Sequence, residues 1–413
     1  MADAGTISRI GGILKTTFGP KVEEQQNKMA VSRKRYGKAS DYWRAPGSAF
    51  VFPARVAGAR GAIAPTASDD PLPASQEQNE QQFTVNDRGY SGQIKFFEKD
   101  IENATKNFQT FIPLMEDRMT NIVQDIEKVI NIDFFNDGSG ILGLVTSVVT
   151  ASTTVPLQVG TSFGQYGSRY LMDSGDVVDF YDPTLTTSRT GGVGVLVTAV
   201  TRSVSAPSIT VSANVTLSAN DVMVRGAGRV NKAYVGIYSM TDDASTSFQG
   251  LSRATYPILK GNHISAATQA LSIGLLQQLE DSIATASGEE PDEILSGKAQ
   301  TQAYRNLAYS QKRYTSMSVD QGFTKLEFNG KEWIEDVDGP SQYLFMLTKD
   351  TIKFGEVSPL NFMDRDGDVL KPLPGFMAYY AVPREFGNFV YTRPNANGRL
   401  DNLAYPSLSP YAK

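Results

Sequence analysis

Residues 98–140, EKDIENATKNFQTFIPLMEDRMTNIVQDIEKVINIDFFNDGSG, carry the clearest structural pattern of the chain. Its apolar side chains recur at spacings of three and four, the period of one helix face: Ile101, Ala104, Phe108, Phe111, Ile112, Met115, Met119, Ile122, Val123, Ile126, Val129 and Ile130. The pattern predicts one amphipathic helix from about Glu98 to Phe135, about 57 Å long at ~1.5 Å per residue. Pro113 is expected to kink it, because proline removes one backbone hydrogen bond.

The end of this helix is marked by glycines. Gly138-Ser-Gly-Ile-Leu-Gly143 matches G-x-G-x-x-G, but it follows a helix where a dinucleotide site would follow a strand. Helix termination and a tight turn explain the glycines better. A coiled coil is the alternative for the helix itself, although the apolar stripe leaves heptad register near Met119 and no second such segment exists.

Two β-like runs precede the helix. One covers Ala49–Val56, and the other covers Gln82–Val85 and then Tyr90–Phe97. Residues 58–81 between them are rich in Gly, Pro, Ser, Asp and Gln, with few large apolar side chains. We predict a long hairpin over residues 44–97 that projects from the body, and because an isolated hairpin is marginal, a partner is expected to cover it.

The first 43 residues show no sustained period apart from a short helix predicted around Val22 to Val31, and we interpret them as an extended arm. Residues 1–60 carry 11 Lys and Arg against 4 Asp and Glu, whereas the whole chain has a formal net charge of −5. A basic arm on an acidic body suits contact with a polyanion or an acidic neighbouring subunit. A solvated, flexible terminus is the equally open alternative.

The region after the glycine turn predicts a β-rich insertion between Gly140 and Met240, because short β-branched runs alternate there with turn residues. The predicted strands are Gly175–Tyr181, Gly194–Thr201, Ser208–Ser212 and Ala233–Tyr238.

Helical spacing returns at Ser265–Ala286 and at Ser296–Tyr309, with a short strand between them. Asn329-Gly330 marks a tight hairpin turn. Further strands are predicted near Tyr343–Leu347, Phe376–Val382 and Phe389–Thr392. Mixed α+β is therefore the predicted fold class.

The length and composition of the chain limit the classes of function that it can have. At 413 residues the chain exceeds one ordinary core, so two or three packing units are expected. The absence of cysteine excludes disulfides and thiolate chemistry, and a single histidine leaves transition metals almost without ligands, so no cofactor or metal is expected. The longest apolar stretch, near Ile141–Val149, is too short to span a bilayer, so no membrane is expected as a partner.

Two motifs match catalytic or metal-binding patterns only formally. Ser162 lies in a G-x-S-x-G pattern and precedes His263 in the chain order of hydrolase triads, but Gln165-Tyr-Gly-Ser is a poor start for the helix that a nucleophile elbow needs. Asp364-Arg-Asp-Gly-Asp resembles a calcium loop, but Lys371 to Pro374 replace the expected glutamate, so we predict a hairpin turn at Asp366-Gly367. The sequence thus predicts no catalytic residues.

Two concentrated basic stretches stand out: Arg33-Lys34-Arg35 and the segment from Arg55 to Arg60. They are too short and too poor in aromatic residues for a domain that reads nucleic-acid sequence. Non-specific phosphate contact is compatible with them. We predict Arg33, Lys34, Arg35, Arg55 and Arg60 as contacts between subunits.

The order of these parts resembles the major capsid proteins of tailed bacteriophages, which have the Hong Kong 97-like fold. No single motif decides the resemblance, which extends over most of the chain. It is carried by the spine helix and by the segments Gln93–Ala104, Asn136–Gly140, Gly250–Pro257, Pro291–Leu295 and Phe328–Asp338.

The resemblance implies a division into domains. Residues 1–43 would be the N-terminal arm and residues 44–97 the extended loop. Residues 98–140 and about 375–413 would form the peripheral domain, and about 141–374 the axial domain with the insertion at 141–240. The expected architecture is therefore α+β with a long spine helix.

The resemblance also implies a function and partners. The chain would self-assemble as hexamers and pentamers into an icosahedral shell around double-stranded DNA, with portal, scaffolding and decoration proteins as partners. Assembly would take place in the host bacterial cytoplasm, and the protein would end in the virion. Some relatives cross-link loop lysines to asparagines, but no lysine lies between Arg44 and Ile94, so a non-covalent shell is expected.

Three alternatives remain. An encapsulin-like nanocompartment would share this fold but enclose cargo enzymes, and the basic arm and long insertion weigh against it. A serine hydrolase would use Ser162 and His263. A β-rich tail or fibre protein is disfavoured by the single spine helix.

Overall fold

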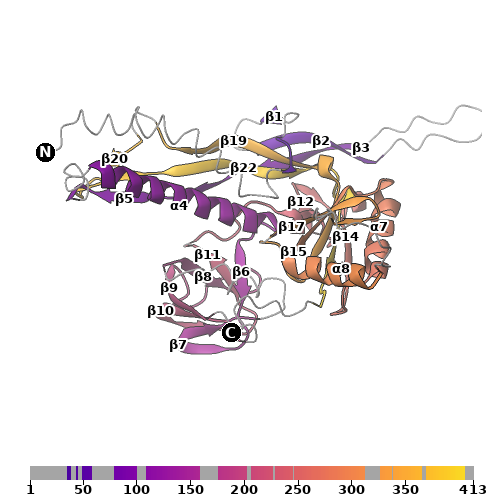
Figure 1. Cartoon of the computed structure of the whole chain (residues 1–413), viewed down its shortest axis with the longest axis horizontal. Helices are drawn as coiled ribbons and strands as arrows, with labels where there is room; N and C mark the ends of the chain where they lie inside the picture. Colours follow the sequence, from indigo (N-terminus) through magenta and orange to yellow (C-terminus); the bar gives the residue numbers. More distant parts are fainter. Residues whose placement is uncertain are drawn as a thin grey trace, which may run out of the picture.

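The computed structural model describes residues 35–38, 43–44, 49–57, 79–99, 108–158, 175–201, 206–226, 228–244, 246–311, 326–336, 338–364 and 369–404. An elongated part contains one long helix and long strands, with one six-stranded sheet at its end and another beneath it (Figure 1). The structure is mixed α+β, which confirms the predicted fold class.

Helix α4 (Phe108–Phe134) lies along the long sheet β19-β22-β4 (Figure 1), whose strands are Ile352–Phe362, Pro383–Tyr391 and Arg88–Ser91. The apolar spacing buries one face of the helix, because residues three and four apart lie on the same side. Side chains of that face pack into the main core with those of the long sheet: Met119, Val123, Ile126, Ile130, Phe354 and Phe389. The helix is the spine that the sequence predicted.

The limits of α4 agree with the prediction where they can be compared. The helix ends at Phe134, and residues 100–107 lie outside the described residues. It continues through Pro113 as one helix. Gly138 and Gly140 have φ values of +90° and +81°, which glycine adopts without steric cost, so they form the predicted turn after the helix has ended at Phe134.

The predicted hairpin pairs β2 (Ala49–Ala57) with β3 (Asn79–Asn86), and β1 (Trp43–Arg44) adds to its edge. Phe50, Phe52, Phe83 and Val85 enter the main core, because alternate residues of a strand share one face. The base of the hairpin is therefore buried within its own chain. Residues 58–78 lie outside the described part.

The run Tyr90–Phe97 does not continue this hairpin, which corrects the prediction. β4 pairs with β22, and β5 (Ile94–Phe97) pairs with β21 (Ala378–Ala381) in a tip sheet that β20 (Lys371–Pro372) completes. The Asn388 amide donates to the Asn86 carbonyl at 2.8 Å, where the chain passes from the hairpin to the long sheet. Backbone groups of this run are thus satisfied by C-terminal strands.

The insertion forms a six-stranded sheet in the order β6-β11-β8-β9-β10-β7, with its own core. Its strands are Ile141–Leu144, Val222–Arg225, Val177–Tyr181, Val195–Thr201, Ser208–Leu217 and Val149–Pro156. Three of the four strands that the sequence predicted lie in this sheet.

The fourth predicted strand, Ala233–Tyr238, is wrong. The segment leads into a short helix, α6 (Ile237–Met240), with Ile237 and Met240 buried. Its backbone N–H groups find side chains: Tyr234 donates to the Tyr90 hydroxyl at 3.2 Å, and Val235 donates to Asn388 Oδ1 at 3.0 Å. Strand pairing is therefore not needed to satisfy them.

The second six-stranded sheet has the order β14-β23-β18-β15-β17-β16, and we call it the helix-flanked sheet. Its strands are Asn262–Ser265, Gly398–Asp401, Leu344–Leu347, Glu293–Gly297, Lys331–Asp336 and Glu327–Phe328. Helices α7 (Ile273–Ser287) and α8 (Lys298–Gln311) flank it (Figure 1), with β15 between them in the chain as predicted.

The predicted start of α7 at Ser265 is wrong. Ala267 and Thr268 have φ values of +47° and +64°, so the chain turns there and cannot be helical. Ser272 caps the helix, accepting from the Leu275 N–H at 3.3 Å.

The Asn329-Gly330 turn is confirmed. Both residues have positive φ, +48° and +76°, and they join β16 to β17 as an antiparallel pair. Short connecting elements complete the fold: β12 (Ser247–Phe248), β13 (Leu251–Ser252), η1 (Pro257–Leu259), η2 (Lys349–Thr351) and η3 (Pro394–Ala396). Within the described ranges, no helix combines the length and apolarity needed to cross a bilayer.

Candidate functional site: an arm dock and an arginine network

The end of the basic arm is held on the helix-flanked sheet. Arg35 Nε donates to Glu293 Oε2 at 2.5 Å, and a second guanidinium nitrogen pairs with Glu332. Glu293 and Glu332 are register partners on the parallel strands β15 and β17. Because adjacent like charges repel across strands, the guanidinium stabilises this pair of carboxylates.

The next residues extend the contact to the spine and the long sheet. Tyr36 is buried, its hydroxyl donates to Glu293 Oε1 at 2.6 Å, and its ring stacks on Phe134 with centroids 5.4 Å apart. Lys38 Nζ lies 2.8 Å from Glu356 Oε2 on β19. Residues 35–38, which we call the arm dock, therefore connect α4 with two sheets.

The other predicted contact residues are less defined. Arg55 is exposed on β2, in register with Glu80 on β3. Arg33, Lys34 and Arg60 lie outside the described residues. The structure thus places Arg35 against its own chain and Arg55 on the surface, and their role between subunits stays a prediction.

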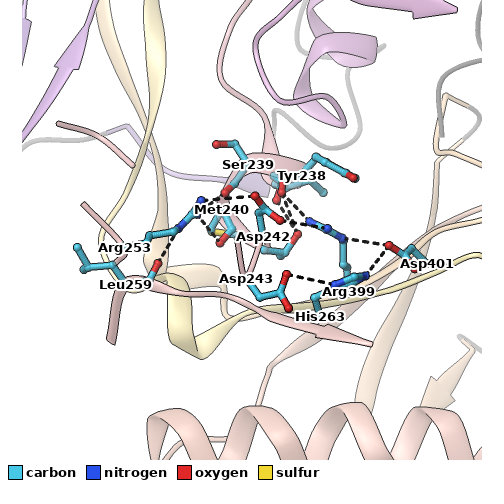
Figure 2. A network of polar contacts seen from close by, with 12 residues as sticks. Tyr238, Ser239, Met240, Asp242, Asp243, Arg253, Leu259, His263, Arg399 and Asp401 are labelled. Atoms are coloured by element: carbon cyan, nitrogen blue, oxygen red, sulfur yellow. Dashed lines mark hydrogen bonds and ion pairs between the residues drawn. The ribbon is translucent and has the colours of Figure 1, made fainter. Parts of the chain in front are cut away.

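A second polar cluster, the arginine network, holds α6 and the following loop against the sheet (Figure 2). Arg253 is 1% exposed and donates to the carbonyls of Leu259 at 3.1 Å and Ser239 at 2.5 Å. Its guanidinium lies 4.5 Å from the centroid of the Phe248 ring. Burial lowers the pKa of Arg253, but an arginine still remains charged.

Arg399 on β23 continues this network (Figure 2). It donates to the Tyr238 carbonyl at 3.0 Å and to Asp242 at 3.4 Å, and its guanidinium lies 4.0 Å from the centroid of the Tyr238 ring. On the neighbouring strand β14, His263 has Nε2 2.5 Å from Asp401 Oδ2 and Nδ1 3.3 Å from Asp243 Oδ1. Both imidazole nitrogens therefore face carboxylates.

This geometry favours the protonated imidazole. The hydrogen bond with Asp401 raises the pKa of His263 above its usual value, although burial opposes the change. Burial alone would raise the pKa of Asp401, but the hydrogen bond with His263 and its charge lower it. The arrangement is that of an ion pair which fixes two strands and a loop.

Stability is expected to fall as the pH rises from about 6.5, the ordinary pKa of histidine, into the alkaline range. The pKa of His263 is raised in the folded protein, so its ion pairs contribute fully below the ordinary pKa. This contribution is lost as the pH rises through the raised value. Thermal unfolding of wild type and His263→Gln over this range measures it, and an equal slope in the two proteins would contradict the assignment.

The described residues do not support the hydrolase alternative. Ser162 lies outside them, and His263 is paired with Asp401 and Asp243. Among the described residues, no group of three or more His, Asp or Glu side chains could hold a metal ion.

Sequence reasoning missed most residues of both clusters. Glu293 begins β15 directly before Ile294 and Leu295, and Glu332 lies between Lys331 and Trp333 on β17. Neither setting gives a sign that a distant arginine covers the carboxylate. Arg253 and Arg399 lie in separate segments without a shared motif. One signal was available: Glu293 lies in the predicted strand Pro291–Leu295. A carboxylate buried in a strand needs a positively charged partner, so a cation could have been expected beside it.

No family model matches the sequence, and no curated protein matches it. Solved structures do match the fold. The capsid asymmetric unit of cyanophage A-1(L) has a TM-score of 0.51 at 10% identity, over 88% of this chain and 91% of that chain.

Two further structures show weaker likeness. A structure of Gordonia phage Cozz has a TM-score of 0.47 at 10% identity, over 92% of this chain and 87% of that chain. The capsid of a native GTA particle has a TM-score of 0.45 at 9% identity, over 91% of both chains. The similarity to the cyanophage capsid is what carries the assignment of fold: the chain has the Hong Kong 97-like fold of phage capsid proteins.

Proposed function

We propose that this chain is a major capsid protein, with a structural and not an enzymatic role. The observation that carries the proposal is the fold, which is similar to the cyanophage A-1(L) capsid subunit over 88% of the chain. We further propose assembly as hexamers and pentamers into an icosahedral shell that encloses a double-stranded DNA phage genome.

The shape supports an assembly role on physical grounds. The spine helix and the long sheet make the molecule elongated (Figure 1). An elongated subunit has a large surface that neighbouring subunits can contact. Heterologous contacts between copies close into rings when the rotation between them closes. A subunit of this shape is therefore suited to a shell wall.

In this proposal the domain limits are those expected from the sequence. Residues 1–43 form the arm, 44–97 the extended loop, 98–140 with about 375–413 the peripheral domain, and about 141–374 the axial domain. Within the extended loop, the hairpin itself ends at Asn86, because residues 88–97 pair with strands of the peripheral domain. Portal, scaffolding and decoration proteins complete the particle, and packaged DNA meets the inner surface without sequence specificity. The particle assembles in the bacterial cytoplasm and remains in the virion.

We also propose that the shell is non-covalent. The extended loop has no lysine between Arg44 and Ile94, so lysine-to-asparagine cross-links cannot start there. In place of cross-links, we propose ion pairs between basic side chains of one subunit and acidic side chains of its neighbour. The candidates are Arg33, Lys34, Arg35, Arg55 and Arg60.

Particles isolated by sedimentation from phage-infected cells test the proposal. They are expected to contain this chain and nuclease-protected DNA, and to run as monomers after boiling in detergent. Covalent ladders in the gel would contradict the non-covalent shell. Particles that hold an enzyme cargo and no DNA would favour the encapsulin-like alternative.

A further inference from the structure

The chain contains two Asn-Gly pairs, and the fold places them in opposite surroundings. Asn329-Gly330 forms the turn between β16 and β17, and both of its residues are exposed. In the second pair Asn397 is fully buried, and Gly398 begins β23. Since the two pairs have the same sequence, a difference in their chemistry must come from the fold.

An Asn-Gly pair carries both partners of a reaction. The backbone nitrogen of the glycine becomes a nucleophile when it loses its proton, and the amide carbon Cγ of the asparagine lies a few bonds away. Holding two such groups in one short segment makes their reaction intramolecular. Glycine has no Cβ to cover the nitrogen or to restrict the backbone. The pair therefore reacts where the backbone can bring the two atoms together.

The surroundings of Asn329 leave this approach open. The strand register joins Phe328 to Lys331, so Asn329 and Gly330 are the two turn residues and lie outside the strand pairing. A Cβ added to Gly330 would meet no heavy atom within 4 Å, so the space beside this residue is open. The turn can therefore change its backbone angles without breaking the pairing of β16 with β17.

The surroundings of Asn397 prevent the same approach. Its Oδ1 accepts from the Thr348 N–H at 2.9 Å, and its Nδ2 donates to the Arg393 carbonyl at 2.8 Å. Gly398 pairs with both neighbouring strands, β14 and β18. A Cβ on Gly398 would lie 2.8 Å from Leu279 Cδ1, so no room is left there for a new ring. The fold therefore keeps the reacting atoms of this pair apart.

We propose that Asn329 is a site of spontaneous hydrolytic deamidation in the folded chain, and that Asn397 is protected from it. The Gly330 nitrogen forms a bond with Asn329 Cγ, and the Cγ–Nδ2 bond breaks. Nδ2 leaves as ammonia, taking the proton that the Gly330 nitrogen has lost. Water then opens the cyclic imide at either carbonyl, which gives aspartate or isoaspartate. One water is consumed, and no atom is oxidised or reduced.

The product would disturb a buried ion pair. Asn329 Nδ2 donates to Gln277 Oε1 at 3.0 Å and to Glu280 Oε2 at 2.9 Å. Glu280 is 6% exposed, and its other oxygen pairs with Lys331, which also lies 3.2 Å from Glu290 Oε2. Deamidation replaces the donor with a second carboxylate beside a buried one, which is unfavourable. The modification therefore weakens the attachment of the turn to α7, whether or not the chain assembles.

Peptide mapping by mass spectrometry tests the site on the full-length protein, stored in mildly alkaline buffer and sampled over weeks. Asn329 should gain the mass difference between a hydroxyl and an amino group at least about tenfold faster than Asn397. Protein unfolded in urea is the matched control, because the two pairs should then convert at similar rates. A smaller ratio in the folded protein, or the same ratio in the unfolded protein, would overturn the proposal.

Two variants measure the consequence for stability. Asn329→Asp reproduces one product, whereas Asn329→Gly removes the amide without adding a charge and suits the positive φ. The Tm of Asn329→Asp is expected to lie a few degrees below that of Asn329→Gly, because only the former adds a carboxylate beside Glu280. Equal Tm values would overturn the proposed weakening of the contact with α7.

Discussion

Gly236→Ala is expected to lower the free energy of unfolding by about 3 kcal/mol, the upper part of the range for overpacking a core. A Cβ at this position would lie within 3.0 Å of the backbone carbonyl oxygens of Asp133, Phe134 and Asn136 at the end of α4. Backbone atoms cannot rotate away as a side chain can. The change must therefore push α6 from the spine, and with it the buried side chains of Ile237 and Met240.

Gly274→Ala is the matched control for this prediction. Gly274 lies in the first turn of α7, where a Cβ would meet only the Ser272 hydroxyl, at 3.9 Å. The same methyl group should there be neutral or slightly stabilising, because alanine favours the helix by up to about 1 kcal/mol. Denaturant unfolding of the unassembled subunit measures both variants. If Gly236→Ala and Gly274→Ala unfold with equal free energies, the close approach of the backbone at Gly236 does not contribute to stability.

Arg253→Leu is expected to cost about 3–5 kcal/mol, the range for breaking a buried charged network. The guanidinium is the donor to the Leu259 and Ser239 carbonyls, and Asp242 lies 3.8 Å from its Nη1. Leucine fills part of the volume but leaves these acceptors without their donor. The segment from α6 to η1 should then lose its fixed position on the sheet.

Two further variants separate the network from a general charge effect. Arg253→Lys keeps the charge but not the planar fork, so an intermediate loss is expected. Arg305 is half-exposed and pairs with Glu335 at 3.1 Å, so Arg305→Leu should cost less than about 1 kcal/mol. If Arg253→Leu is no more destabilising than Arg305→Leu, the buried network does not hold this part of the fold.

Elements whose signal is local could be predicted from the sequence. The spacing of Met119, Val123 and Ile126 sets the buried face of α4 wherever the rest of the chain lies. The Asn329-Gly330 turn is equally local, because its positive φ angles suit those two residue types. The order of such elements along the chain was sufficient to predict the capsid-like fold.

The wrong secondary-structure predictions lie in segments whose conformation is determined by tertiary contacts. Apolar spacing continues back from α7 toward Ser265, but Ala267 and Thr268 take positive φ to bring the chain off β14. The β-branched pattern at Ala233–Tyr238 is overridden because backbone N–H groups of this segment donate to the side chains of Tyr90 and Asn388, which lie far away in the sequence. Propensity is a weak guide when distant partners satisfy the backbone.

The polar clusters could not be predicted for a related reason. Arg35 lies 258 positions from Glu293, and His263 lies 138 positions from Asp401. No spacing rule connects residues that meet only through sheet pairing. The positive charge of the arm indicated only that the arm binds an acidic surface. For Arg35 this surface is formed by Glu293 and Glu332 of its own chain.

Negative-stain electron microscopy of the purified protein after size-exclusion chromatography tests the capsid proposal most directly. We expect closed shells, or rings of five or six subunits. A monodisperse small species that forms no curved assembly at any concentration would contradict it.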